Sequence, residues 1–137
     1  MRVLKRFSGL YILAWVLADQ GIKYWVLNRM STGDVIPVLP GFDLRLGFNP
    51  GIAFGLYHDV GMFARGLMYS FIGALIIWVA MEAGKAIERG NQLSILAWIT
   101  VLAGALGNYI DRLWRGAVVD YIDLYYGQWH WYTFNLA

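Results

Sequence analysis

Three apolar stretches, each about 20 residues long, decide what this chain can fold into, because a helix of that length crosses the hydrocarbon core of a bilayer. They run from about residue 9 to 27, from 62 to 83 and from 93 to 113. Hydrophobic residues make up 59% of the chain and charged residues only 15%, against roughly 25% in a soluble domain. The sequence therefore predicts an all-α integral membrane protein that forms a single domain over residues 1–137.

Basic residues predict the orientation of these spans. Three of them precede the first stretch, and Lys85 and Arg89 lie in a turn predicted over residues 84–92. The positive-inside rule places both regions in the cytoplasm. Residues 28–61 and 114–137 then face the outer side. Within them, residues 43–48 alternate apolar and polar side chains, which is typical of a short strand.

Composition excludes several kinds of site and partner. The chain has no cysteine, so it can form neither a disulfide nor a thiolate site. His58 and His130 belong to no zinc-binding pattern, and we expect no metal or other cofactor. The net charge is +2 and the basic residues form no stripe, so nucleic acid is not an expected partner.

Polar side chains inside the apolar stretches need a reason, because they are costly in a membrane. Asp19 and Lys23 are four residues apart and share a helix face. They predict either an ion pair inside a helix bundle or a contact with the head group of a substrate.

A second polar group closes the third stretch, with four residues spaced to share one helix face: Asn108, Asp111, Arg112 and Arg115. The simpler interpretation is a helix end at the interface, where Arg112 neutralises Asp111. Asp120 follows in an outer segment, residues 117–126, that reads as a strand or an irregular stretch. Two carboxylates that share a proton can act as general acid and base without a metal, which suits this composition.

Four motifs resemble, in order, those of lipoprotein signal peptidase, also called signal peptidase II. They are DQGIK (19–23), FNPGIAFG (48–55), GALGNYIDRLWRGAVVDYID (104–123) and TFNLA (133–137). Together they cover nearly the whole chain. The second and third motifs are highly specific, whereas the first alone would be weak.

The resemblance implies a transmembrane bundle of four helices, three of them present here, with a small periplasmic β-cradle. It implies a multi-pass protein of the bacterial inner membrane whose active site faces the periplasm. The implied activity is that of an aspartic endopeptidase, which removes the signal peptide from diacylglyceryl-modified prolipoproteins. Prolipoprotein, membrane lipid and globomycin-type inhibitors are the implied partners.

The two catalytic aspartates of the family map onto Asp120, in VVDY, and onto the position directly after Ala137, where the family's FNxAD motif ends. We therefore expect the 137-residue chain to be inactive by itself. Asp123 is expected to face solvent, and the aromatic run at Trp129 and Trp131 to contact acyl chains or form an aromatic belt. Supporting or substrate-binding roles fall on Asp19, Lys23, Asn49, Gly51, Ala53, Asn108, Asp111, Arg112 and Asn135.

Two alternatives remain open. The spaced aspartates of DRLWRGAVVDYID faintly resemble those of the CDP-alcohol phosphatidyltransferases, which bind metal, but that family's DG pair is absent here. The other alternative is a non-catalytic membrane protein that binds prolipoprotein, or an ion pathway through Asp19 and Lys23. The second apolar stretch offers almost no polar residue to such a pathway.

Overall fold

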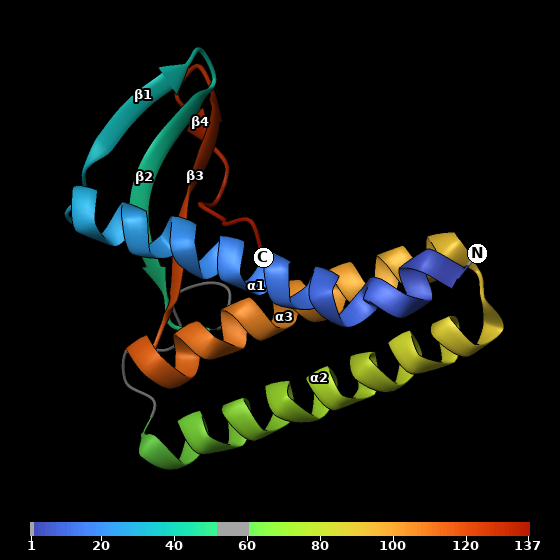
Figure 1. Cartoon of the computed structure of the whole chain (residues 1–137). Coiled ribbons are helices and arrows are strands. Elements are labelled where there is room, and N and C mark those ends of the chain that lie inside the picture. Colours follow the sequence, from blue (N-terminus) through green and yellow to red (C-terminus); the bar gives the residue numbers. More distant parts are fainter. Residues whose placement is uncertain (1, 52–60) are drawn as a thin grey trace.

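A layer of three long helices carries a small sheet at one of its ends (Figure 1). The structure, a computed structural model, describes residues 2–51 and 61–137. The sheet is antiparallel, with strand order β1-β2-β3-β4. The elements follow one another as α1 (Arg2–Arg29), β1 (Val35–Leu39), β2 (Phe42–Asn49), α2 (Met62–Arg89), α3 (Gln92–Arg115), β3 (Val118–Tyr126) and β4 (Trp129–His130).

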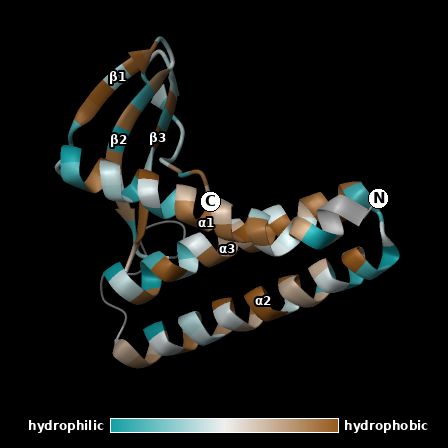
Figure 2. Cartoon of the chain, viewed as in Figure 1, coloured by the Kyte–Doolittle hydropathy of each residue, from teal (hydrophilic) through white to brown (hydrophobic). Residues whose placement is uncertain are grey.

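The three predicted spans are three helices, each of which extends beyond its apolar stretch. α2 and α3 have 28 and 24 residues and are long and apolar enough to cross a membrane, since each contains an 18-residue stretch with a mean hydropathy of 1.7. α1 is as long as α2. Apolar residues fill the middle of the helices, and hydrophilic residues gather at the turn between α2 and α3 (Figure 2).

The turn predicted over residues 84–92 is shorter than expected, because α2 continues to Arg89. Gly84 stays helical, and the helix ends only where Gly90 adopts a left-handed conformation with a φ of 74°. The amide of Gly90 donates to the carbonyl of Ala86 at 3.0 Å. Asn91 then caps α3, since its side chain accepts a hydrogen bond from the amide of Ser94 at 3.1 Å.

α3 is the central helix and packs against both α1 and α2. Small side chains let α2 approach closely, and a buried cluster joins the two helices through Ala83, Ala86, Ile95 and Ile99. On the other side, the hydroxyl of Tyr11 in α1 lies 2.9 Å from that of Thr100 in α3. α3 is therefore in contact with α2 on one side and with α1 on the other.

The sheet is anchored on the last turns of α1. Val26 and Met30 pack there against three buried side chains of the sheet, Leu46, Val119 and Tyr121. The predicted strand over residues 43–48 lies within β2 and is confirmed. The outer stretch after α3 forms β3, and an irregularity in the pairing of β2 with β3 brings Gly47 opposite Asp120.

The chain turns back between β3 and β4, at residues 127–128, and after β4 it continues antiparallel to β3. Trp131 donates its amide to the carbonyl of Leu124 at 2.8 Å, and Phe134 donates to that of Ile122 at 3.0 Å. Ala137 then lies against α3, where a Cβ on Gly104 would sit 2.7 Å from the carbonyl carbon of Ala137. The FNLA segment is thereby placed between the sheet and the central helix.

The expectation that Asp123 faces solvent is wrong, because this side chain is only 1% exposed. β3 is an inner strand of the sheet, with β2 on one side and β4 on the other. The carboxylate lies between Arg45 of β2 and His130 of β4, which both bind it. A side chain on an inner strand is covered from both neighbours, and the alternation of residues along one strand does not reveal that.

Candidate active site

The site forms where α3 gives way to β3. Gly116 ends the helix with a φ of 77°, and its amide donates to the carbonyl of Arg112 at 3.2 Å. β3 begins two residues later, so Asp120 follows the helix end closely. Asp120 is 6% exposed, which is unusual for a carboxylate on a strand.

Asn135 of the FNLA segment holds the Asp120 carboxylate. Its Nδ2 atom donates to Asp120 Oδ1 at 2.8 Å and also lies 3.0 Å from Asn108 Oδ1. The carbonyl of Val119 is a third acceptor at 3.2 Å, although an amide group has only two N–H donors. The amide of Ala137 donates to Asn135 Oδ1 at 2.8 Å, which fixes the orientation of the side-chain amide.

Burial raises the pKa of the Asp120 carboxyl above its ordinary value. Hydrogen bonding by Asn49 and Asn135 opposes this shift, as do the charges of Lys23 and Arg112. Within the described part of the chain, no cation forms an ion pair with Asp120. A buried carboxyl with amide partners alone can hold a proton at a higher pH than an ordinary aspartate.

A buried ion cluster lies near Asp120, between α1 and α3. Lys23 is fully buried, and its Nζ atom lies 2.8 Å from Asp19 Oδ2, 2.8 Å from Asp111 Oδ2 and 3.1 Å from Asn108 Oδ1. Asp19 and Asn108 accept hydrogen bonds from this ammonium group, and Asp111 forms an ion pair with it. The ion pair expected between Asp19 and Lys23 is therefore formed, and it is enclosed by the protein.

Asp111 links this cluster to β3. Its Oδ2 atom accepts the amide of Val119 at 3.1 Å, so it holds the backbone at the residue before Asp120. Its Oδ1 atom binds Arg115 and also accepts from Gln20 Nε2 at 3.2 Å. The interpretation that Arg112 neutralises Asp111 is wrong, because Lys23 and Arg115 form the ion pairs.

Sequence reasoning missed two features of this cluster. Gln20 contacts Asp19, Asp111 and Arg115, and the only signal for it was its place inside the DQGIK motif. Gly107 is the other, since a Cβ there would overlap the carboxylate of Asp19. Glycine is thus what allows α1 to approach α3 at the depth of the ion cluster.

Arg112 faces a different direction, toward the end of β2. Its Nη1 atom donates to the carbonyl of Asn108 at 3.1 Å, while Nε is buried without a hydrogen-bond partner within residues 2–51 and 61–137. Gly51 lies beside it with a φ of 121°, and a Cβ there would come within 3.3 Å of Arg112 Nε. Asn49 Oδ1 accepts the amide of Gly51 at 3.0 Å. Ala53 lies outside the described residues.

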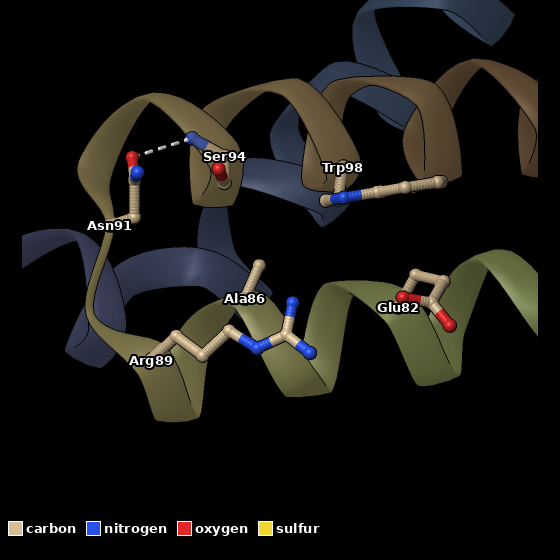
Figure 3. A pocket seen from close by; sticks show the side chains of 6 residues that line it. All are labelled: Glu82, Ala86, Arg89, Asn91, Ser94 and Trp98. Atoms are coloured by element: carbon tan, nitrogen blue, oxygen red, sulfur yellow. Dashed lines mark hydrogen bonds between the residues drawn. The ribbon is translucent and has the colours of Figure 1, made fainter.

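The structure therefore brings most of the expected residues together around Asp120. A pocket of about 390 Å³ lies elsewhere, at the turn between α2 and α3, and so at the opposite end of α3 from Asp120 (Figure 3). Its charged lining residues are Glu82 and Arg89. It is separate from the candidate site.

The chain is similar to known proteins. The family model described as Signal peptidase (SPase) II matches residues 11–137. A lipoprotein signal peptidase of Blochmanniella pennsylvanica is 43% identical over 122 residues, which are 89% of this chain and 73% of the relative. One from Escherichia coli (strain K12 / DH10B) is 39% identical over 128 residues, which are 92% of this chain and 76% of the relative.

The fold matches a solved structure as well. A bacterial membrane enzyme determined by the in meso method at 2.3 Å resolution superposes with a TM-score of 0.72 and 28% sequence identity. The match covers 94% of this chain and 76% of that one. A second such structure, at 1.9 Å resolution, gives the same TM-score and covers 81% of its chain. The chain therefore belongs to the signal peptidase II family of aspartic peptidases.

Proposed function

We propose that this protein removes the signal peptide from prolipoproteins, with Asp120 as one of two catalytic aspartates. The names of its relatives give the substrate class. One observation carries the assignment of Asp120: among the residues that the structure describes, its buried carboxylate is held by the Asn135 amide and forms no ion pair, and burial raises its pKa. Such a group can exchange a proton during a reaction, whereas an ion-paired carboxylate is held in one state.

The second acid is the aspartate that closes the FNxAD motif in this family, at the position after Ala137. Ala137 donates its amide to the same Asn135 side chain that donates to Asp120. The next residue would therefore start beside Asp120. Of two such carboxyls, the ionised one takes a proton from a water molecule while that water attacks the scissile carbonyl. The protonated one donates its proton to the oxygen of that carbonyl. The two acids titrate as a unit.

Arg112, Asn49 and Gly51 are suited to hold the peptide backbone of the substrate. Arg112 has a buried Nε–H group that no described residue accepts, and the backbone of Gly51 lies so close that a Cβ there would be 3.3 Å from Nε. A carbonyl oxygen of an extended peptide would satisfy that donor. The diacylglyceryl group would lie in the lipid next to the site, within reach of the exposed rings of Trp131 and Tyr132. Globomycin-type inhibitors are expected to compete for this region.

The location we propose is the bacterial inner membrane, with Asp120 on the periplasmic side. Lys85 and Arg89 lie at the turn between α2 and α3, at the far end of α3 from Asp120. Basic residues favour the cytoplasmic side, so the opposite helix ends would face outward. A lipid-modified peptide would meet the aspartates at the membrane surface.

The test is cleavage of a diacylglyceryl-modified prolipoprotein in detergent, followed by gel shift. The enzyme is the extended chain, which is the 137 residues continued by the family's aspartate and following helix. The 137-residue chain runs beside it. We expect the extended chain to cleave, and its Asp120→Asn variant to lose at least about 100-fold in rate.

Asp34→Asn is the matched control, since Asp34 is an exposed carboxylate in the turn before β1 and should not affect cleavage. EDTA should have no effect, whereas the phosphatidyltransferase alternative requires metal. If a folded extended chain cleaves nothing, the peptidase assignment is wrong. Retention of prolipoprotein by that inactive chain would then favour the non-catalytic binding protein.

A further inference from the structure

Outside the candidate site, a group of charged side chains lies around Asp123 in the sheet. The Asp123 carboxylate binds Arg45 Nε of β2 at 2.9 Å. His130 Nδ1 of β4 lies 3.0 Å from Oδ1 and 2.9 Å from Oδ2 of the same carboxylate. The imidazole ring also stacks on Tyr125, with ring centroids 5.1 Å apart. One buried carboxylate thus joins three strands through side-chain contacts.

The backbone holds the end of the sheet by a short strand pair and, beyond it, by hydrogen bonds at Trp131 and Phe134. β4 consists of two residues, paired as Tyr125 with His130 and Tyr126 with Trp129. So short a strand pair is only marginally stable. A slip of one residue in its register would turn every following side chain to the other face. The contact between His130 and Asp123 adds to these backbone bonds in fixing the register, because it forms only when the two side chains share a face.

The register of this strand decides where Asn135 lies. After β4, the carbonyl of Phe134 accepts the amides of Tyr121 at 2.9 Å and Ile122 at 2.8 Å. The next residue, Asn135, donates to Asp120. Residues 120–135 therefore form a loop that begins and ends at the contact between Asp120 and Asn135. The contact between His130 and Asp123 lies within this loop.

We propose that His130, acting through Asp123, is a positioning residue that holds residues 131–137 in register and thereby keeps the Asn135 amide on Asp120. This inference rests on the proposed function. Four ionisable side chains face one another here, Asp43 and Arg45 of β2, Asp123 of β3 and His130 of β4. Nδ1 donates in the imidazolium and in the Nδ1–H neutral tautomer alike, so the contact does not depend on protonation of His130.

Two substitutions of His130 in the extended chain separate the hydrogen bond from the ring. His130→Asn keeps an N–H donor close to the position of Nδ1 and removes the ring. His130→Phe keeps a ring that can stack on Tyr125 and removes the donor. We expect His130→Phe to lower kcat roughly 10- to 100-fold with little change in KM, since small misplacements of catalytic groups cost that much. His130→Asn should retain most of the wild-type kcat.

The pH–rate profile gives a readout that a purely structural role would not move. Hydrogen bonding by Asn135 lowers the pKa of Asp120, so its loss raises that pKa. The acid limb of the profile should therefore move to higher pH in His130→Phe and stay in place in His130→Asn. A variant that merely folded less well would lose activity equally at all pH values.

Amide hydrogen exchange tests the same inference without any activity. Peptides that cover residues 119–136 of the extended chain should exchange faster in His130→Phe than in wild type, and His130→Asn should match wild type. If the wild-type extended chain does not cleave, the proposed function fails and exchange alone decides. Wild-type exchange and activity in His130→Phe would overturn the inference, as would equal defects in both variants.

Discussion

Three buried aspartates follow one another along the end of α3 and β3, and they differ in what surrounds them. Asp111 is held by Lys23 and Arg115 in the helix layer, and Asp123 by Arg45 and His130 in the sheet. Asp120 lies between these two regions and has amide partners in place of cations. All three are at most 6% exposed. Burial alone therefore does not distinguish these three carboxylates, whereas the groups that bind them do.

The comparison predicts opposite behaviour for Asp120 and its two neighbours, and the largest effect falls on Asp120. Asp120→Asn should reduce cleavage by at least about 100-fold. Because burial raises the pKa of Asp120, its ionisation opposes folding as the pH rises through that pKa. The Asp120→Asn variant, whose side chain is uncharged, should therefore have a Tm in detergent at pH 7 that is equal to or higher than that of the wild type. A clear drop in Tm would show that the Asp120 carboxylate contributes to stability, which would contradict this comparison.

The second prediction concerns the ion-paired aspartates of the helix layer, whose cation is Lys23. Lys23→Met leaves the carboxylates of Asp19 and Asp111 buried side by side, and such a loss typically costs about 3–5 kcal/mol of folding free energy. Unfolding in detergent would measure it. Lys85→Met is the matched control, because Lys85 forms only an exposed pair with Glu82 and should cost less than about 1 kcal/mol. Equal effects would contradict the importance of the buried cluster.

Gly104 tests whether the position of the FNLA segment controls activity. A Cβ there would lie 2.7 Å from the carbonyl carbon of Ala137, so Gly104→Ala should displace that segment. We expect kcat of the extended chain to fall roughly 10- to 100-fold. Gly84→Ala in α2 meets nothing within 4 Å and should stabilise the helix slightly without changing kcat. A fully active Gly104→Ala enzyme would contradict this arrangement.

The amide partner of Asp120 predicts a shift in pH dependence. Asn135→Leu removes a hydrogen bond that lowers the pKa of Asp120, so the pKa should rise. Activity that needs an ionised carboxylate would then require a higher pH, and the acid limb of the pH–rate profile should move upward. Asn28→Leu changes an exposed amide that contacts only Tyr24 and should leave the profile unchanged. A downward shift for Asn135→Leu would contradict the assigned role.

The smallest effect is expected in the sheet, at Arg45. Its side chain is 43% exposed, and Asp123 keeps His130 as a partner when it is lost. Arg45→Met should therefore cost less than about 1 kcal/mol and leave kcat nearly unchanged. A loss as large as that of Lys23→Met, measured by the same unfolding assay, would mean that the sheet depends on its charges as strongly as the helices do.

Local patterns in the sequence predicted several parts of this site correctly. The spacing of Asp19 and Lys23 predicted their ion pair, and the alternation over residues 43–48 predicted a strand. Local patterns gave wrong results where a partner comes from a distant segment. Arg112 follows Asp111 directly and looked like its counter-ion, but adjacent helix residues do not face each other, and Lys23 of another helix occupies that place.

The sequence by itself determined that the chain is a membrane protein, where its three helices lie and, through the four motifs, to which family it belongs. These depend on the length of apolar stretches and on residue identity, and both are local properties. Only the tertiary structure decided that Asp111 and Asp123 pair with cations from distant segments. Lys23 and Asp111 lie on different helices, as Arg45 and Asp123 lie on different strands. Such partners are far apart along the chain, and only packing brings them within a few ångströms, where charge and burial act.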